Sequence, residues 1–88
     1  MRIWKEAGQV VGFTVQYETT VAGKRLPVVR YDTSHGFAHR DRLDRRGREI
    51  AKDAVAPGMP LSDALAIADR DLKQNWRRYR HEFLQGTP

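Results

Sequence analysis

The sequence contains no cysteine, and this absence removes several kinds of chemistry at once. Disulfide bonds, thiolate catalysis and cysteine-ligated zinc sites are all excluded. A chain without cysteine suits a reducing compartment, so we predict a cytoplasmic location.

Long apolar runs and the common nucleotide-binding and catalytic motifs are also missing. No apolar stretch approaches the roughly 18–20 residues that a membrane-spanning helix needs, so we expect no membrane association. The segment Met1–Glu6 lacks the apolar run of a signal peptide. There is no glycine-rich phosphate loop, no nucleophile elbow and no helix-turn-helix pair. These absences argue against an NTPase, a serine hydrolase and a DNA reader that uses a recognition helix.

The chain is short, charged and basic. Its 88 residues predict a single domain over residues 1–88. With 40% hydrophobic and 31% charged residues, the composition is that of a globular domain rather than a disordered one. The net charge of +5 favours a polyanionic partner, with nucleic acid first, RNA included, and an acidic protein second. An arginine-rich surface that only contacts solvent would give the same balance.

The first part of the chain carries the period-2 pattern of β-strands. Apolar residues alternate with polar ones from Val11 to Glu18, which predicts a half-buried strand. A hairpin loop is expected at Thr19–Lys24, because Gly23 lies within it. Further strands are predicted over residues 25–32, 37–43 and, more weakly, 48–53. The sheet should therefore occupy about residues 9–54.

The last part of the chain changes to a period near 3.6. Apolar residues spaced by three and four from Leu61 to Phe83 predict one helix over about residues 62–84, with Ser62 as its N-cap. The expected fold class is α+β: an antiparallel meander of three to four strands with one long C-terminal helix packed on one face. The other face of the sheet should lack a cover within this chain.

Titratable side chains of different chemistry gather between Tyr31 and Asp41. Imidazoles titrate near neutral pH and can act as acid or base, so His39 and His35 are the first candidate catalytic residues. Asp41 lies two residues from His39 on the same strand face and could orient it. Tyr31 and Asp32 complete the candidate site. Each has a structural alternative: backbone contacts for the histidines, core packing for Tyr31 and an Asx-turn for Asp32.

The two histidines do not predict a metal site. If residues 35–39 formed one strand, the two Cα atoms would lie about 13 Å apart. A turn at Gly36 could bring them together, but no further ligand stands at a fixed offset. We therefore predict no metal and no cofactor.

Arginines around the same segment form the candidate nucleic-acid contacts. Alternating Arg40 and Arg42 share a strand face and could straddle phosphates. The alternative is a solvated loop with local ion pairs to Asp41 and Asp44. The complete predicted set is Arg30, Arg40, Arg42, Arg45 and Arg46.

The segment Arg30-Tyr31-Asp32, followed by His35-Gly36 and His39-Arg40, resembles a core found in small prokaryotic proteins of unknown function. More distantly, it resembles the TumE family of toxin-antitoxin components. Residues 61–65 and 75–77 are similar to the opening and closing of the helix that follows in that family. The resemblance implies a helix-turn-helix antitoxin as partner. Asp41 stands where that family has its second histidine, and the lysine of the family's glycine turn has no counterpart, so a non-toxic relative is also consistent.

Three hypotheses about the function follow. The first is a small toxin-like protein that cleaves RNA without metal, with His39 or His35 as acid and base and arginines on the phosphate. The second is a non-catalytic module that binds nucleic acid or an acidic protein through its arginines. The third is a homodimer formed through the uncovered face of the sheet.

Overall fold

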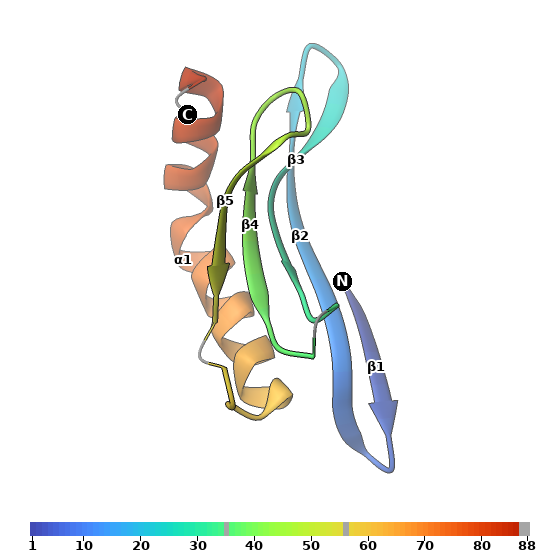
Figure 1. Ribbon diagram of the computed structural model, residues 1–88. Coiled ribbons are helices and arrows are strands. Elements are labelled where there is room, and N and C mark those ends of the chain that lie inside the picture. The colour runs from blue at the N-terminus through green and yellow to red at the C-terminus, as the bar shows by residue number, and fades with distance from the viewer. Residues whose placement is uncertain (35, 56, 87–88) are drawn as a thin grey trace.

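The computed structural model describes residues 1–34, 36–55 and 57–86. It contains an antiparallel sheet of five strands in the order β1-β2-β3-β4-β5, followed by one helix (Figure 1). The elements are β1 (Arg2–Glu6), β2 (Gln9–Val21), β3 (Lys24–Asp32), β4 (His39–Leu43), β5 (Glu49–Ala54) and α1 (Leu61–Gln85). The α+β class and the single C-terminal helix are confirmed, but the prediction of three to four strands was wrong.

The strand that the sequence pattern did not reveal is β1. All five of its residues are exposed, so neither face of the strand carries the apolar alternation of a half-buried strand. It pairs with β2 across a turn at Ala7–Gly8, whose φ angles of 49° and 78° are both positive. A turn with positive φ at both central residues matches the right-handed twist of the two strands that it joins.

Two predicted strand boundaries were also wrong. The expected loop at Thr19–Lys24 is mostly strand, because β-branched Thr19, Thr20 and Val21 continue the pairing up to a tight turn at Ala22–Gly23. The third predicted strand begins at His39 rather than at Phe37. Gly36 has a φ of 86°, and the ladder between β3 and β4 ends at Asp32 and His39, so Phe37 lies outside it.

Helix α1 packs on β2 and β3 and closes the core on one side of the sheet. Its buried residues Ala64, Ala68, Tyr79 and Phe83 belong to the same core cluster as Phe13, Val15, Val29 and Tyr31 of the sheet. Burying each large apolar side chain stabilises the fold by about 1.5–3 kcal/mol. Pro60, not Ser62, occupies the N-cap position and offers no side-chain hydrogen bond, while Gly86 ends the helix in the left-handed conformation at φ 67°.

Strand alternation sends neighbouring side chains to opposite faces of the sheet. Val29 and Tyr31 of β3 point towards α1, and so do Arg40 and Arg42, their partners across the β3–β4 ladder. Arg30 and Asp32 therefore point to the opposite face, as do their partners Asp41 and His39. Throughout the described ranges, no helix is long and apolar enough to cross a membrane.

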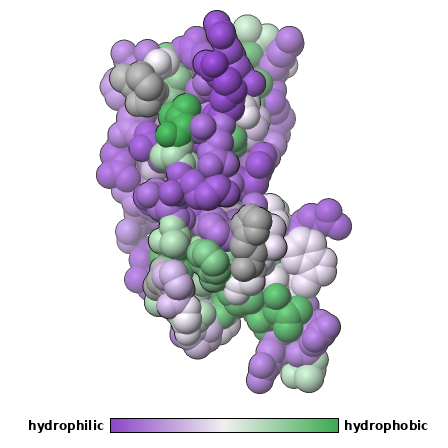
Figure 2. Space-filling view, in the orientation of Figure 1, coloured by the Kyte–Doolittle hydropathy of each residue, from purple (hydrophilic) through white to green (hydrophobic). Residues whose placement is uncertain are grey.

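Side chains of different character gather at different ends of the molecule. In Figure 2, hydrophilic residues dominate the upper half, where Figure 1 places the C-terminal end of α1 and the β2–β3 and β4–β5 turns. Apolar residues gather in the lower half, near the β1–β2 hairpin and the start of α1. Met1, Ile3, Trp4 and Val11 of that hairpin are 67%, 40%, 47% and 46% exposed.

Candidate functional site

The sheet divides the predicted catalytic cluster into two groups. Tyr31 lies under α1, whereas Asp32, His39 and Asp41 lie on the opposite face. His35 falls outside the described residues. Tyr31 therefore does not share a site with His39, and the arginines are divided in the same way.

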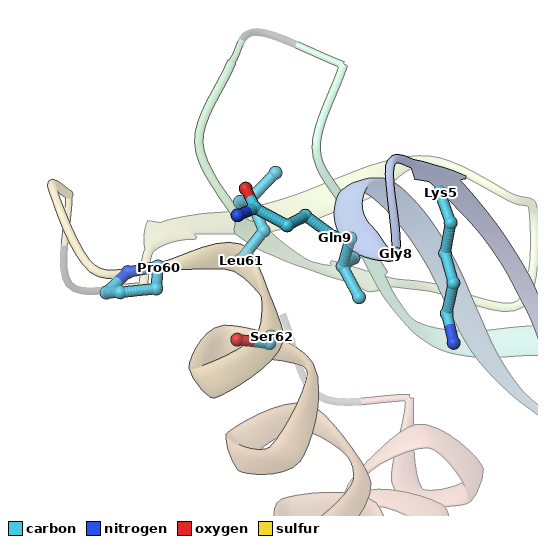
Figure 3. Close-up of a pocket in the computed structure, with 7 residues that line it drawn as sticks. Lys5, Gly8, Gln9, Pro60, Leu61 and Ser62 are labelled. Carbon is cyan, nitrogen blue, oxygen red and sulfur yellow. The ribbon is translucent and has the colours of Figure 1, made fainter.

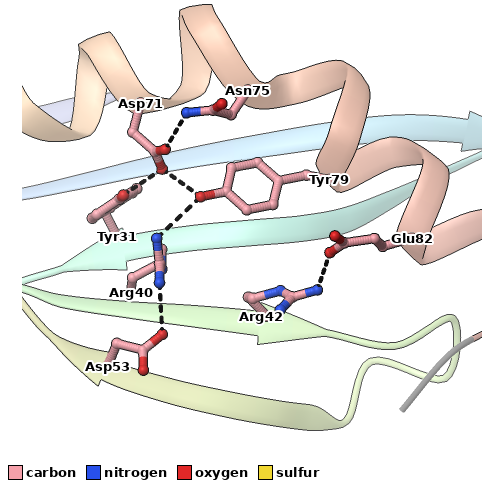
Figure 4. A network of polar contacts seen from close by, with 8 residues as sticks. All are labelled: Tyr31, Arg40, Arg42, Asp53, Asp71, Asn75, Tyr79 and Glu82. Carbon is pink, nitrogen blue, oxygen red and sulfur yellow. Dashed lines mark hydrogen bonds and ion pairs between the residues drawn. The ribbon is translucent and has the colours of Figure 1, made fainter.

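Beneath the helix, Asp71 organises a partly buried polar network (Figure 4). Its Oδ2 accepts hydrogen bonds from the hydroxyls of Tyr31 at 2.5 Å and Tyr79 at 2.7 Å. Its Oδ1 accepts one from Asn75 Nδ2 at 2.8 Å. Burial acts to raise the pKa of Asp71, but these donors outweigh it and hold that pKa below its usual value. Burial and the nearby carboxylate raise the pKa of Tyr31.

Arg40 extends the network from the helix to the far edge of the sheet. Its guanidinium donates to Tyr79 Oη at 3.1 Å and to Asp53 Oδ2 at 2.8 Å. The hydrogen bond to Asp53 is the largest of the effects that raise the pKa of Arg40. Arg42 forms an ion pair with Glu82 of α1 in the same way. Arg40 and Arg42 therefore join the sheet to the helix. Because a carboxylate already engages each guanidinium, both arginines are poorly placed to contact phosphate.

The opposite face carries the histidine of the predicted site. His39 Nδ1 lies 4.0 Å from Asp32 Oδ1, and the rings of Phe37 and His39 have centroids 4.4 Å apart. Burial acts to raise the pKa of Asp32, but the backbone and hydroxyl of Ser34 and the charge of His39 lower it overall. Only 5% of the surface of His39 is exposed. A general acid or base must reach its substrate, and this burial limits access to the imidazole.

Asp41 contacts a lysine next to this group. Its Oδ1 lies 3.2 Å from Lys52 Nζ, which raises the pKa of the lysine, and only 6% of Asp41 is exposed. Arg30 donates to Gln16 Oε1 at 2.9 Å on the same face. In the described ranges, no group of three or more histidine, aspartate or glutamate side chains could hold a metal ion.

The turn between β4 and β5 holds the last two predicted arginines. Arg45 donates from its guanidinium to the carbonyl oxygen of Leu84, near the end of α1. Arg48 pairs with Asp44 at 2.9 Å, whereas the side chain of Arg46 is exposed. Together with Asp44 and Gly86 they line a shallow hollow of about 290 Å³. The turn and the end of the helix therefore form one continuous surface.

A second hollow lies on the last turns of α1. It measures about 410 Å³ and is lined by Trp76, Arg77, Arg80, His81, Leu84 and Gln85. The Arg77 guanidinium lies 4.6 Å from the centre of the half-buried Trp76 ring, which also packs edge-on against Tyr17. Among the described residues, neither Arg77 nor Arg80 forms an ion pair.

We call this combined surface the basic end, defined by Arg45, Arg46, Trp76, Arg77 and Arg80. Sequence reasoning pointed to the first two arginines but missed the other three residues. The apolar spacing from Leu61 to Phe83 includes Trp76, and such a spacing indicates a buried helix face rather than a ring that borders exposed cations. The available signal was a tryptophan followed directly by arginine, one turn before Arg80.

Another groove, of about 450 Å³, lies at the opposite end of the molecule (Figure 3). Lys5, Gly8, Gln9 and Val10 line it from the β1–β2 hairpin, and Pro60, Leu61 and Ser62 line it from the start of α1. None of the predicted site residues contributes to it. Its one charged side chain is Lys5, so it lacks the mixture of acid, base and cation that catalysis needs.

Comparisons with known proteins give one match. The model of a protein family described as a domain of unknown function (DUF7718) matches residues 1–88. No curated protein and no solved structure matches the chain.

Proposed function

The chain belongs to the DUF7718 family of domains of unknown function, and from its geometry we propose that it is a non-catalytic module that binds single-stranded RNA through the basic end. One observation carries this proposal. Arg77 and Arg80 form no ion pair within the described structure, although other arginines such as Arg40, Arg42 and Arg48 are held by carboxylates. Arg80 Nε donates to Thr19 Oγ1 at 3.3 Å, so the contact that holds it is to a neutral group. Both cations line the same hollow as the Trp76 ring, where a base and its phosphate could be bound together.

RNA suits this surface better than an acidic protein does. Single-stranded nucleic acid is bound by a cationic surface that follows the backbone and by flat side chains on which bases stack. Trp76, with the Arg77 guanidinium over its ring, supplies such a flat pair. Arg80 lines the same hollow, and Arg46 lines the hollow at the β4–β5 turn. An acidic protein would need the cations but would gain little from the exposed part of the tryptophan ring.

Fluorescence anisotropy of a labelled oligouridine, titrated with protein, tests the proposal. If Arg46, Arg77 and Arg80 each neutralise one phosphate, the affinity should fall about twentyfold between roughly 50 and 200 mM salt. Arg77→Glu should weaken binding by about tenfold and flatten the salt dependence. Arg70→Glu is the matched control, because Arg70 is exposed on the same helix and lies two turns earlier. Equal effects of the two substitutions would show that only net charge matters and would overturn the assignment.

A competition experiment separates the two classes of partner. Unlabelled oligouridine should displace the labelled strand, while polyglutamate of similar charge should displace it weakly, because polyglutamate cannot stack on Trp76. Displacement by polyglutamate at the same concentration would favour the acidic-protein alternative.

RNA cleavage centred on His39 is the second candidate, and the contact with Asp32 is the observation in its favour. The same RNA, recovered after incubation and resolved on a denaturing gel, tests it. Intact RNA in the presence of the wild-type protein fits a binding module. Cleavage that is lost in His39→Ala would instead restore the catalytic proposal. The helix-turn-helix antitoxin and the cytoplasmic location stay predictions.

A further inference from the structure

The first strand of the sheet has an open edge. β1 pairs with β2 on one side, and each of its five residues is exposed. Its two large apolar residues, Ile3 and Trp4, are 40% and 47% exposed. A free strand edge presents unpaired backbone N–H and C=O groups that can continue the sheet into another chain. The side chains that β1 carries determine which chain can pair with it.

The order of residues in β1 is complementary to itself. If two copies pair antiparallel about Trp4, Arg2 of each faces Glu6 of the other, Ile3 faces Lys5, and the two Trp4 rings face each other. Arg2, Trp4 and Glu6 alternate along the strand and so share one face of the sheet, which puts each opposite-charge pair on the same side. Cross-strand pairs of opposite charge and of aromatic rings are those that stabilise antiparallel ladders.

We propose that β1 is a homodimer interface, in which two copies pair antiparallel through this strand and form one continuous sheet of both chains. The partner is a second copy because the strand supplies its own complement: a positive charge at one end and a negative charge at the other. Pairing of identical edges about a two-fold axis is closed, so assembly stops at the dimer.

The opposite edge of the sheet does not offer the same complement. The charged side chains of β5 are engaged within the chain, Lys52 with Asp41 and Asp53 with Arg40. In an antiparallel pairing of β5 with itself, Glu49 would face Ala54 and Ile50 would face Asp53. The sheet therefore has one edge with a self-complementary order and one without.

The proposed interface is separate from the basic end. β1 lies across the molecule from the C-terminal end of α1, so pairing through β1 leaves Arg77 and Arg80 accessible in both copies (Figure 1). The inference does not depend on the proposed RNA binding, and the two can fail independently.

Sedimentation velocity of the full chain, from about 1 µM to about 1 mM, tests the proposal. The wild-type chain should shift from monomer to dimer across this range, as expected for a small interface. Arg2→Glu and Glu6→Arg should each weaken dimerisation by about tenfold or more, because each substitution turns two attractive contacts into repulsive ones. Lys24→Glu, at the exposed first residue of β3, changes the charge to the same extent and should leave the dimer intact.

Two complementary measurements keep the test independent of folding defects. An equimolar mixture of Arg2→Glu and Glu6→Arg should form a heterodimer, since every charged pair is then restored. The double variant Arg2→Glu/Glu6→Arg should recover the homodimer for the same reason. A wild-type chain that stays monomeric at the highest concentration overturns the proposal. So does a dimer that neither single substitution weakens, and so does a mixture that does not associate.

Discussion

Replacing Tyr31 with phenylalanine isolates one hydrogen bond of the network beneath α1. The Tyr31 hydroxyl donates to Asp71 Oδ2 at 2.5 Å, and the side chain is only 2% exposed. Phenylalanine fills nearly the same volume and leaves no cavity, so the substitution removes the hydroxyl and little else. A hydrogen bond to a charged acceptor contributes about 1.5–3 kcal/mol to stability. Asp71 keeps donors from Tyr79 and Asn75, which places the expected loss near the lower end, at about 2 kcal/mol.

This loss is large for a domain of 88 residues. At roughly 0.05–0.15 kcal/mol per residue, the whole domain should have a stability of about 4–13 kcal/mol. The midpoint of thermal unfolding should fall by roughly 10 °C. Urea unfolding at pH 7, followed by circular dichroism, should show a lower midpoint with an unchanged slope, because the substitution does not change the surface exposed on unfolding.

Tyr17→Phe is the matched control. The Tyr17 ring packs edge-on against Trp76 at 6.2 Å, and its hydroxyl forms no hydrogen bond among the described side chains. Its removal should change the free energy of unfolding by less than about 0.5 kcal/mol. If Tyr31→Phe is as mild as this control, the network does not hold the helix on the sheet and the reasoning fails.

The free energy of unfolding of the wild-type protein should also depend on the ionisation of Tyr31 at alkaline pH. Because the pKa of Tyr31 is raised in the folded state, its contribution to stability is complete below its usual value near 10. The contribution is lost as the pH rises from there towards the folded-state pKa. The fall in stability above pH 10 should therefore be less steep in Tyr31→Phe than in the wild type, since Tyr79 and Lys52 still contribute in this way but residue 31 does not.

Two further substitutions test the contributions of Asp71 and Gly86 to the stability of the domain. Asp71→Asn should lower the free energy of unfolding by about 2 kcal/mol at pH 7, because three donors lose a charged acceptor. The folded-state pKa of Asp71 is depressed, so its contribution is present above about pH 4 and is lost below it. The difference from wild type should narrow in urea titrations at pH 3, and a constant difference would contradict this assignment. Gly86→Ala should lower stability by about 1 kcal/mol, because Gly86 ends α1 at φ 67°, whereas Gln85→Ala should not.

The sequence predicted the elements whose burial pattern is regular. Alternation revealed β2 and β3, and the spacing from Leu61 to Phe83 placed α1 within one residue of its observed ends. β1 could not be found in this way, because a strand exposed on both faces has no apolar alternation to detect. The edge of the sheet was therefore missed although its interior was found.

The candidate site was harder to predict because it depends on register. Alternation correctly placed His39 with Asp41, and Arg40 with Arg42, on shared faces of β4. It could not state which of these pairs shares a face with Tyr31, because that depends on how the connection between β3 and β4 sets the ladder. Asp32 pairs with His39, so Tyr31 pairs with Arg40. Asp71 lies 40 residues from Tyr31, and no local pattern connects the two.

The order of the strands has a consequence for how the chain folds. Each strand of the sheet pairs with its neighbour in sequence, so the ladders can form hairpin by hairpin as short-range contacts, an arrangement that favours rapid folding. During synthesis β5 emerges before α1, which follows within a few seconds at ordinary rates of elongation. Until then Phe13, Val15 and Val29 have no helix to cover them. The nascent sheet thus passes through an interval in which its apolar side is open to other chains, and the speed with which α1 docks determines how long that exposure lasts.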